Sequence, residues 1–222
     1  MAKSKLDHGI IMKALDYAYD KAIGGVKGLD SAEEIALSYM NNDKDINTNT
    51  DALIRWQISK AGTSGFLTGL GGLITLPIAI PANVTSVIYI QVRMIAAIAY
   101  IGGYDLKDDK VKTLVFLCMA GSGAKEILKD LGIALGARIT TKLIESISSK
   151  AIIAINQKVG FKLLATFGEK GMINLGKAVP LVGGIIGGTF DSISTNVIGN
   201  IAKKTFISPQ PTANNDDIQI IE

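Results

Sequence analysis

Apolar residues recur at spacings of three and four along most of the chain, which is the period of an α-helix lying on a core. This spacing predicts a first amphipathic helix over residues 9–23. Residues 31–34, Ser-Ala-Glu-Glu, have the capping-box pattern and predict the start of a second helix. Residues 41–50 are almost wholly polar and predict a surface loop before a third helix. No useful stretch alternates with a period of two, so the pattern predicts an all-α fold.

The middle of the chain is nearly without charge. Residues 61–104 contain one charged side chain, Arg93. Pro77 and Pro81 each lack a backbone donor, so one straight helix cannot pass through both. We therefore expect a break at the prolines, followed by a new helix over 84–101.

The rest of the chain also predicts helices. Asp105 is expected to cap one of them, with Asp108 three residues later. A second uncharged segment, 178–190, contains four glycines. We predict one multi-helix domain over residues 1–207, with Gly-rich apolar helical hairpins, and a flexible tail over 208–222.

Several glycines in the apolar segments are four residues apart. Glycine at this spacing clears one face of a helix, so that a second backbone can approach closely. The same device serves tight packing within a domain and helix association in a membrane. The predicted helix-packing glycines are Gly65 and Gly69, Gly183 and Gly187, and Gly184 and Gly188.

Composition narrows the class of protein. Of 222 residues 48% are apolar and 19% are charged, and the net charge is +3. The mean hydropathy of +0.32 excludes a disordered, highly charged regulator. One cysteine and one histidine exclude a Cys-rich or multi-histidine metal centre built within the chain. We find no catalytic constellation, and expect no metal and no cofactor.

Arg93 is the most informative single residue, because a buried guanidinium must be paired. One interpretation is a salt bridge with a carboxylate such as Asp105 or Asp191. The alternative is that Arg93 and Gln91 face a cleft and hold an anionic head group. The candidate lipid- or ligand-binding residues are Gln91, Arg93, Asp105, Asp191 and Trp56.

Basic residues gather in one region. Residues 107–177 contain 12 Lys and Arg against 6 Asp and Glu. Three pairs at a spacing of four share helical faces and predict a basic surface, made by Lys125 and Lys129, Arg138 and Lys142, and Lys158 and Lys162. An anionic lipid surface fits these faces. Nucleic acid is not an expected partner, because the local aromatic residues are not interleaved with the bases.

The sequence does not show a clear membrane span. Residues 84–101 are long enough, but Gln91 and Arg93 lie at their middle, where an arginine is costly in lipid. A buried core and a hairpin that dips into one leaflet both fit the pattern. No signal-peptide core is present near the N-terminus, so we expect a cytoplasmic protein, with association to the inner face of the cell membrane as a further expectation.

The chain resembles the EcsC family of bacterial proteins over nearly its whole length except the tail. The motifs that carry the resemblance are Trp56-Gln57, the Gly-rich apolar segment after it, Gln91-x-Arg93, Gly102-Gly103-Tyr104-Asp105, and the segment from Pro180 to Asp191. The family is named for its association with an ABC-transporter operon in Gram-positive bacteria. The resemblance implies a bacterial cytoplasmic protein linked to membrane processes, and it carries over no catalytic residue.

Three functions fit these observations. The leading one is a non-enzymatic, peripheral membrane-associated or lipid-binding helical protein, in which apolar hairpins at 61–82 and 178–190 meet anionic lipid. The second is a soluble adaptor or regulator of an ABC transporter or secretion system, with the apolar segments wholly internal. The third is an enzyme acting on a lipid substrate, which would show polar side chains converging on a tunnel.

Overall fold

The computed structural model describes residues 7–41, 43–61, 82–132, 144, 147–167 and 186–207. These residues form α-helices and one short 3₁₀ turn, with no strand among them, which confirms the all-α prediction. The helices are α1 (His8–Gly24), α2 (Ala32–Met40), α3 (Ile46–Ala61), α5 (Ala82–Ile101), α6 (Asp109–Met119), α7 (Ala124–Asp130), α9 (Ser149–Phe167) and α11 (Ile186–Phe206), with the 3₁₀ turn η1 at Gly121–Gly123.

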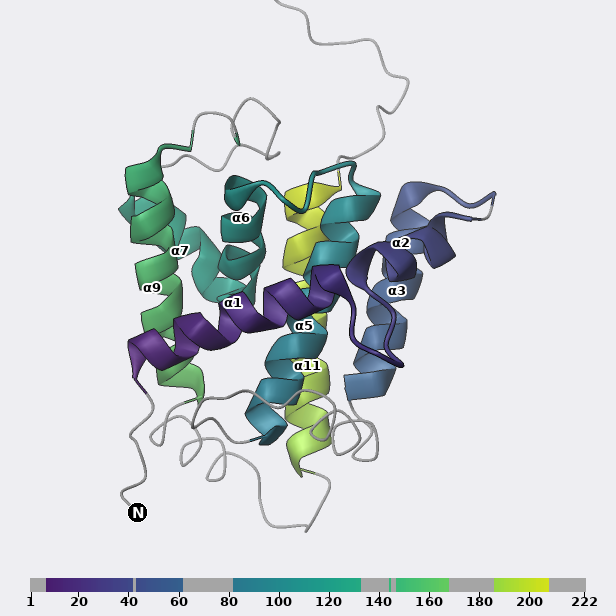
Figure 1. Ribbon diagram of the computed structural model, residues 1–222, viewed down its shortest axis with the longest axis horizontal. Coiled ribbons are helices and arrows are strands. Elements are labelled where there is room, and N and C mark those ends of the chain that lie inside the picture. The colour runs from purple at the N-terminus through teal and green to yellow at the C-terminus, as the bar shows by residue number, and fades with distance from the viewer. Residues whose placement is uncertain are drawn as a thin grey trace, which may run out of the picture.

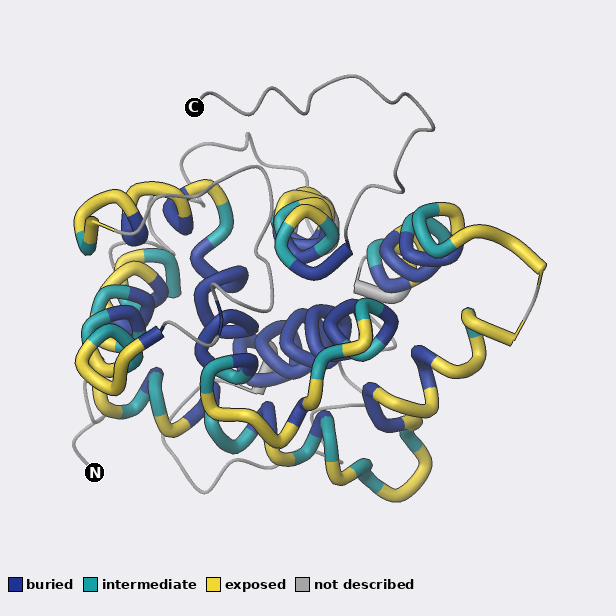
Figure 2. Tube along the Cα trace, turned by 90° about the horizontal axis from the view of Figure 1, so that it is seen from above, coloured by how far each residue is buried: buried dark blue, intermediate teal, exposed yellow. Residues whose placement is uncertain are grey.

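Helix α5 forms the centre of the fold. It contacts α1, α2, α3, α6 and α11, and in Figure 2 its tube runs through the middle of the molecule. Its side chains from Val84 to Ala99 are all buried. The apolar stretch that a membrane span would need therefore lies inside the protein: the window Val84–Ile101 has the length and hydropathy of a span, but 94% of it is buried.

Contacts with neighbouring helices show the direction in which each helix runs. Gln91 of α5 donates to Ser194 of α11, and Gly102, just after α5, lies close to the main-chain oxygen of Phe206 at the end of α11. Because the two contacts follow the same order along both helices, α5 and α11 run parallel. Helix α3 runs the other way beside α11, since Asp51 near its start pairs with Lys203 near the end of α11.

As a result, α3 ends and α5 begins at the same end of the bundle, and α9 ends and α11 begins there too (Figure 1). The chain leaves the described part at this end over residues 62–81 and again over 168–185. The predicted break at Pro77 and Pro81, most of the segment 178–190 and the tail 208–222 lie outside the described residues.

Local sequence signals explain the helix ends. The Ser31 hydroxyl accepts from the Glu34 amide at 3.2 Å, and the Glu34 carboxylate accepts from the Ser31 amide at 2.7 Å, which confirms the predicted capping box. At the end of α5 the Tyr104 amide donates to Ala99 and the Gly103 amide to Tyr100. Gly103 has φ +83°, which a glycine adopts without the cost of a Cβ, so the helix closes in a Schellman motif.

Two predicted boundaries are wrong. Helix α3 begins at Ile46, inside the run 41–50 that predicts a loop, because the Asp45 carboxylate accepts from the amides of Asn47 and Thr48 and so caps the helix. Helix α6 is capped by Asp108 and not by Asp105. The side chain of Asp105 accepts instead from the Lys107 amide in the preceding turn.

Candidate functional site

The central helix is apolar except for a few side chains that it buries. Thr85, Ser86, Gln91 and Arg93 are each at most 2% exposed. A buried polar group is costly unless it is hydrogen-bonded, so the partners of these side chains indicate where the core is adapted to polar chemistry.

Gln91 reaches toward α11. Its Nε2 donates to the hydroxyl of Ser194 at 3.0 Å and to that of Thr195 at 3.2 Å. Its Oε1 has no hydrogen-bond partner among the described residues, although the side chain is 1% exposed. One end of the amide is thus fixed by two hydroxyls, and the other end keeps an unused acceptor in a buried position.

Arg93 reaches in another direction. Its Nη1 donates to the backbone carbonyl of Asp30 at 3.0 Å, and its guanidinium lies 5.1 Å from the centroid of the Tyr89 ring. Burial lowers the pKa of Arg93, and Tyr89 and Asp30 act against that shift. The predicted salt bridge to Asp105 is wrong, because Asp105 is exposed and bonded within its own turn to the amide of Lys107. The structure also does not bring Gln91 and Arg93 together in one cleft.

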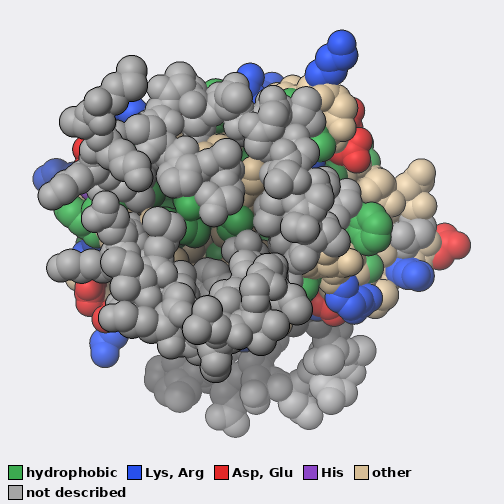
Figure 3. Space-filling view, turned by 90° about the horizontal axis from the view of Figure 1, so that it is seen from below, with side chains coloured by type: hydrophobic (Ala, Val, Ile, Leu, Met, Phe, Trp, Pro, Cys, Tyr) green, Lys and Arg blue, Asp and Glu red, His purple; other side chains and the backbone are tan. Residues whose placement is uncertain are grey.

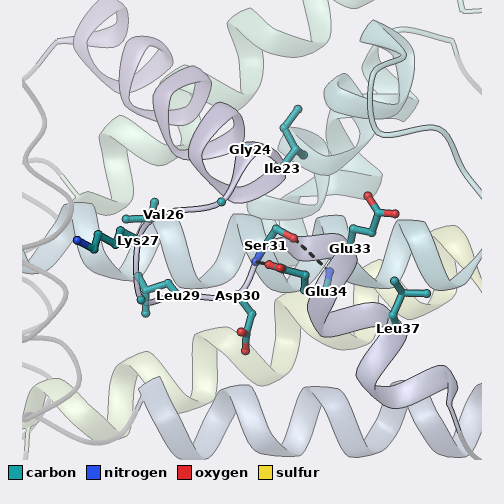
Figure 4. Close-up of a pocket in the computed structure, with 12 residues that line it drawn as sticks. Ile23, Gly24, Val26, Lys27, Leu29, Asp30, Ser31, Glu33, Glu34 and Leu37 are labelled. Atoms are coloured by element: carbon teal, nitrogen blue, oxygen red, sulfur yellow. Dashed lines mark hydrogen bonds between the residues drawn. The ribbon is translucent and has the colours of Figure 1, made fainter.

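An open hollow of about 840 Å³ lies over the loop between α1 and α2 (Figure 4). The Ser31–Glu34 hydrogen bonds cross its centre, and the carboxylates of Asp30 and Glu33 point away from each other. The polar groups at the centre of this hollow are therefore used in starting α2. We assign no ligand to it.

A second cavity, of about 220 Å³, lies between α5, the end of α6, η1, α9 and α11. We call it the Gln91 pocket. Its apolar wall consists of Met119, Ala120, Leu163, Phe167, Val197 and Ile198. Its polar groups are Gln91, Ser122, Lys162, Thr166 and Ser194. A small cavity with apolar walls and a few convergent polar groups has the composition of a ligand site.

Two lysines on α9 differ in their surroundings. Lys158 pairs with Asp130 at 2.6 Å. Lys162, one turn later, lines the Gln91 pocket, and among the described residues no carboxylate lies within 4.0 Å of it. The Lys162 side chain passes over Gly123 of η1, and a Cβ added to Gly123 would lie 2.9 Å from Cε of Lys162. The glycine therefore leaves room for an ammonium group at the pocket, and Lys162 is the one charged lining residue.

Residues 11–207 match the model of the EcsC protein family. The chain belongs to the EcsC protein family. The match covers every described helix except the first turn of α1. No curated protein and no solved structure matches the chain.

The remaining predicted ligand residues of this EcsC-family chain do not meet at one place. Trp56 is 52% exposed on α3, and Asp105 lies in the turn that follows α5. Asp191 belongs to α11, but its side chain lies outside the described part of the structure. The prediction that these residues bind a ligand together stays a prediction.

The structure describes only some of the residues predicted to form the basic surface and the glycine packing faces. Lys125 and Lys129 lie on α7 and are exposed, and α7 packs against α9, which carries Lys158 and Lys162. Arg138 and Lys142 fall outside the described residues, as do Gly65, Gly69, Gly183 and Gly184. Gly187 and Gly188 lie in the first turn of α11. Their use in helix packing stays a prediction.

The one cysteine and the one histidine of this EcsC-family chain both contact a neighbouring element. Cys118 is 1% exposed and contacts Thr205, and burial raises its pKa to about 12. His8 lies on α1, where its ring nitrogen meets the Gln157 carbonyl at 3.1 Å. No group of three His, Cys, Asp or Glu side chains in the described residues could hold a metal ion.

Most of the Gln91 pocket has no signature in the sequence. Ser122, Thr166 and Ser194 come from three separate elements and have no shared motif. One signal was available: Ser194 and Thr195 are adjacent hydroxyl residues in a helix that starts apolar, which is the kind of position that bonds across to a neighbouring helix.

Proposed function

We propose that this protein is a peripheral, membrane-associated helical module that binds anionic lipid without catalysing a reaction, on the cytoplasmic face of the membrane. The observation that carries the proposal is the position of four helix ends. The first apolar segment joins the end of α3 to the start of α5, and the second lies between the end of α9 and the start of α11. All four of these helix termini lie on one side of the bundle (Figure 1). Both segments are therefore attached on the same side.

The surface at this end supports the proposal. In Figure 3, seen from below, the described side chains in view include hydrophobic ones that show between undescribed residues, and charged ones at parts of the outline. Ile193, two turns into α11, is 62% exposed, and Val197, one turn later on the same face, is 41% exposed. Exposed apolar side chains with charged ones nearby are the arrangement expected where a protein rests on lipid.

Electrostatics would add to this contact. A Lys or Arg near an anionic membrane surface contributes about 1 kcal/mol, and the effect falls off within a Debye length. Lys125, Lys129 and Lys162 are exposed on the adjoining helices α7 and α9. We therefore expect binding that combines an apolar contact with a salt-sensitive one.

One observation favours the second candidate, a soluble adaptor or regulator of an ABC transporter. The most apolar described helix, α5, lies in the core, with 94% of its window Val84–Ile101 buried. If residues 62–81 and 178–185 are internal in the same way, no lipid contact is needed, and a protein partner such as a transporter subunit replaces the membrane.

Sedimentation with vesicles of phosphatidylglycerol and phosphatidylcholine tests the proposal. We expect the full chain to pellet with anionic vesicles at low salt and to be released at high salt. Ile193→Asp, near the proposed lipid-facing end, should lower the bound fraction several-fold. Ile153→Asp is the matched control, since Ile153 is 66% exposed near the start of α9, at the other end of the bundle. Failure to pellet at low salt, or an equal loss in both variants, would contradict the proposal.

A further inference from the structure

Three features of the Gln91 pocket have no hydrogen-bond or ion-pair partner among the described residues: a buried acceptor, a lysine and an apolar wall. Gln91, which lines the pocket, has an unpartnered buried acceptor, Oε1, on a side chain that is 1% exposed. The one charged lining residue of the pocket is Lys162, with no carboxylate of the described residues within 4.0 Å. The remaining wall of the pocket is apolar, with Leu163, Phe167 and Val197 on two facing helices.

These features specify the chemistry of an occupant. An unused acceptor requires a hydrogen-bond donor such as a hydroxyl, because a buried carbonyl without a donor costs free energy. A lysine without a carboxylate partner attracts an anion. Apolar walls favour methylene groups. A single-chain lipid with a phosphate, a nearby hydroxyl and an alkyl chain carries all three groups in that order.

The size and place of the cavity agree with such a ligand. A volume of about 220 Å³ is below the usual range for a whole drug-sized ligand, so it fits a head group with its first methylenes and excludes a diacyl lipid. Thr166 and Phe167, which line it, form the last turn of α9 at the end of the bundle assigned above to lipid contact. A chain that leaves the pocket there continues toward the membrane.

We propose that the Gln91 pocket binds the head of a single-chain anionic lipid, with the phosphate at Lys162 and the first methylenes along Phe167 and Val197. A shift of the Gln91 side chain toward the cavity lets a glycerol hydroxyl of the lipid donate to its buried Oε1. The proposal rests on the proposed function, because the alkyl chain is taken to come from the membrane. It adds to that function a discrete site of one-to-one stoichiometry. The ligand's hydroxyl satisfies the acceptor that Ser194 and Thr195 leave free.

Titration calorimetry with the full chain tests this site, with myristoyl lysophosphatidylglycerol below its critical micelle concentration as the probe. We expect one molecule bound per chain. Lys162→Gln should weaken the affinity about tenfold, as expected for one charge-assisted contact. Val197→Phe should abolish binding by filling a half-open wall, and it is expected to fold because Val197 is 41% exposed.

Matched controls separate the site from general effects. Lys158→Gln removes a lysine one turn away that already pairs with Asp130, and Ile193→Phe enlarges an exposed residue of α11 that does not line the pocket. Both should bind the probe within twofold of the unchanged chain. Equal affinity in Lys162→Gln and Val197→Phe and in their controls would overturn the proposal.

Two further probes identify the source of the head group. Myristoyl lysophosphatidylcholine should bind at least tenfold more weakly, because its ammonium would lie near Lys162, and equal binding would overturn the assignment of the phosphate. Glycerol 3-phosphate should not bind measurably; binding as tight as the lysolipid would show a soluble phosphate ester as the ligand and overturn the lipid source. If vesicles bind but the lysolipid does not, the pocket proposal fails and the proposed function stands. If the lysolipid binds at the pocket but vesicles do not, the membrane contact fails instead.

Discussion

Gln91 and Arg93 are two residues apart on α5 and serve opposite sides of the core. Gln91 bonds to Ser194 and Thr195 of α11, whereas Arg93 bonds to the carbonyl of Asp30 before α2. Two residues along an α-helix turn through about 200°, so the two side chains leave the helix nearly opposite each other. Gln91 and Arg93 look like one motif in the sequence, but they bond the central helix to two different parts of the fold.

Replacing Arg93 tests whether its charge or its volume stabilises the fold. Arg93→Met keeps most of the buried volume and removes a charge that no described carboxylate pairs, so we expect the free energy of unfolding to change by less than about 1 kcal/mol. Arg93→Ala leaves a cavity and should cost about 3 kcal/mol. Urea unfolding measures both. Equal large losses in the two variants would show that the charged hydrogen bond to Asp30 is essential.

Gly102→Ala should destabilise the protein. A Cβ at this position would collide with the main-chain oxygen of Phe206, which cannot rotate away as a side chain can. We expect a loss of about 2 kcal/mol in the free energy of unfolding. Gly24→Ala is the control: it ends α1 with no atom within 4 Å of the added Cβ, and should raise stability by about 0.5 kcal/mol. Equal effects of the two substitutions would contradict the close approach of α5 and α11.

Alkaline pH should weaken the fold through Cys118. Burial raises the pKa of its thiol to about 12, whereas the unfolded thiol ionises near pH 8.5, so rising pH favours the unfolded chain. This stability is complete below pH 8.5 and is lost as pH rises toward 12. Between pH 8 and pH 10 we expect a loss of about 2 kcal/mol, measured by urea unfolding. In Cys118→Ala the decline should be smaller by that amount, and an unchanged decline would rule Cys118 out as its source.

Ser31→Ala removes the hydroxyl that caps α2 and should cost about 1 kcal/mol. Ser38→Ala, in the same helix, removes an exposed hydroxyl that donates to the Ile35 carbonyl, and should change stability by less than about 0.5 kcal/mol. The Ser31 amide, which donates to the Glu34 carboxylate, is the main cause that lowers the pKa of Glu34 below its ordinary value, and the Ser31 hydroxyl adds to it. The stability that these bonds contribute is present at neutral pH and is lost as pH falls through the lowered pKa. Because Ser31→Ala keeps the amide and removes only the hydroxyl, most of this dependence on pH should remain in the variant.

Local signals in the sequence were enough for most of the fold. The capping box at Ser31 and the glycine at 103 act within a few residues, so both can be recognised from the sequence alone. The start of α3 was missed because a polar run predicts a loop, although Asp45 can equally supply a cap. Asp105 and Asp108 both have capping chemistry, and the sequence alone does not show which one the turn selects.

Long-range partners were much harder to predict. The partner of Arg93 is a backbone carbonyl, which every residue possesses, so no side-chain type could identify Asp30 in advance. The Gln91 pocket draws on five elements, α5, α6, η1, α9 and α11, that meet only after folding. The sequence did single out Gln91 and Lys162, because an amide in an apolar helix and a lysine on a basic face stand out against their neighbours. It could not place the two residues beside one cavity.

The parallel course of α5 and α11 has a practical consequence. Positions 193 and 207 are 14 residues apart along the course of α11, or about 21 Å at 1.5 Å per residue. A fluorophore attached at position 207 would therefore lie farther from the proposed contact than one attached at position 193. Energy transfer to a dye-labelled bilayer would then read out the docking pose directly: strong from the second position and faint from the first.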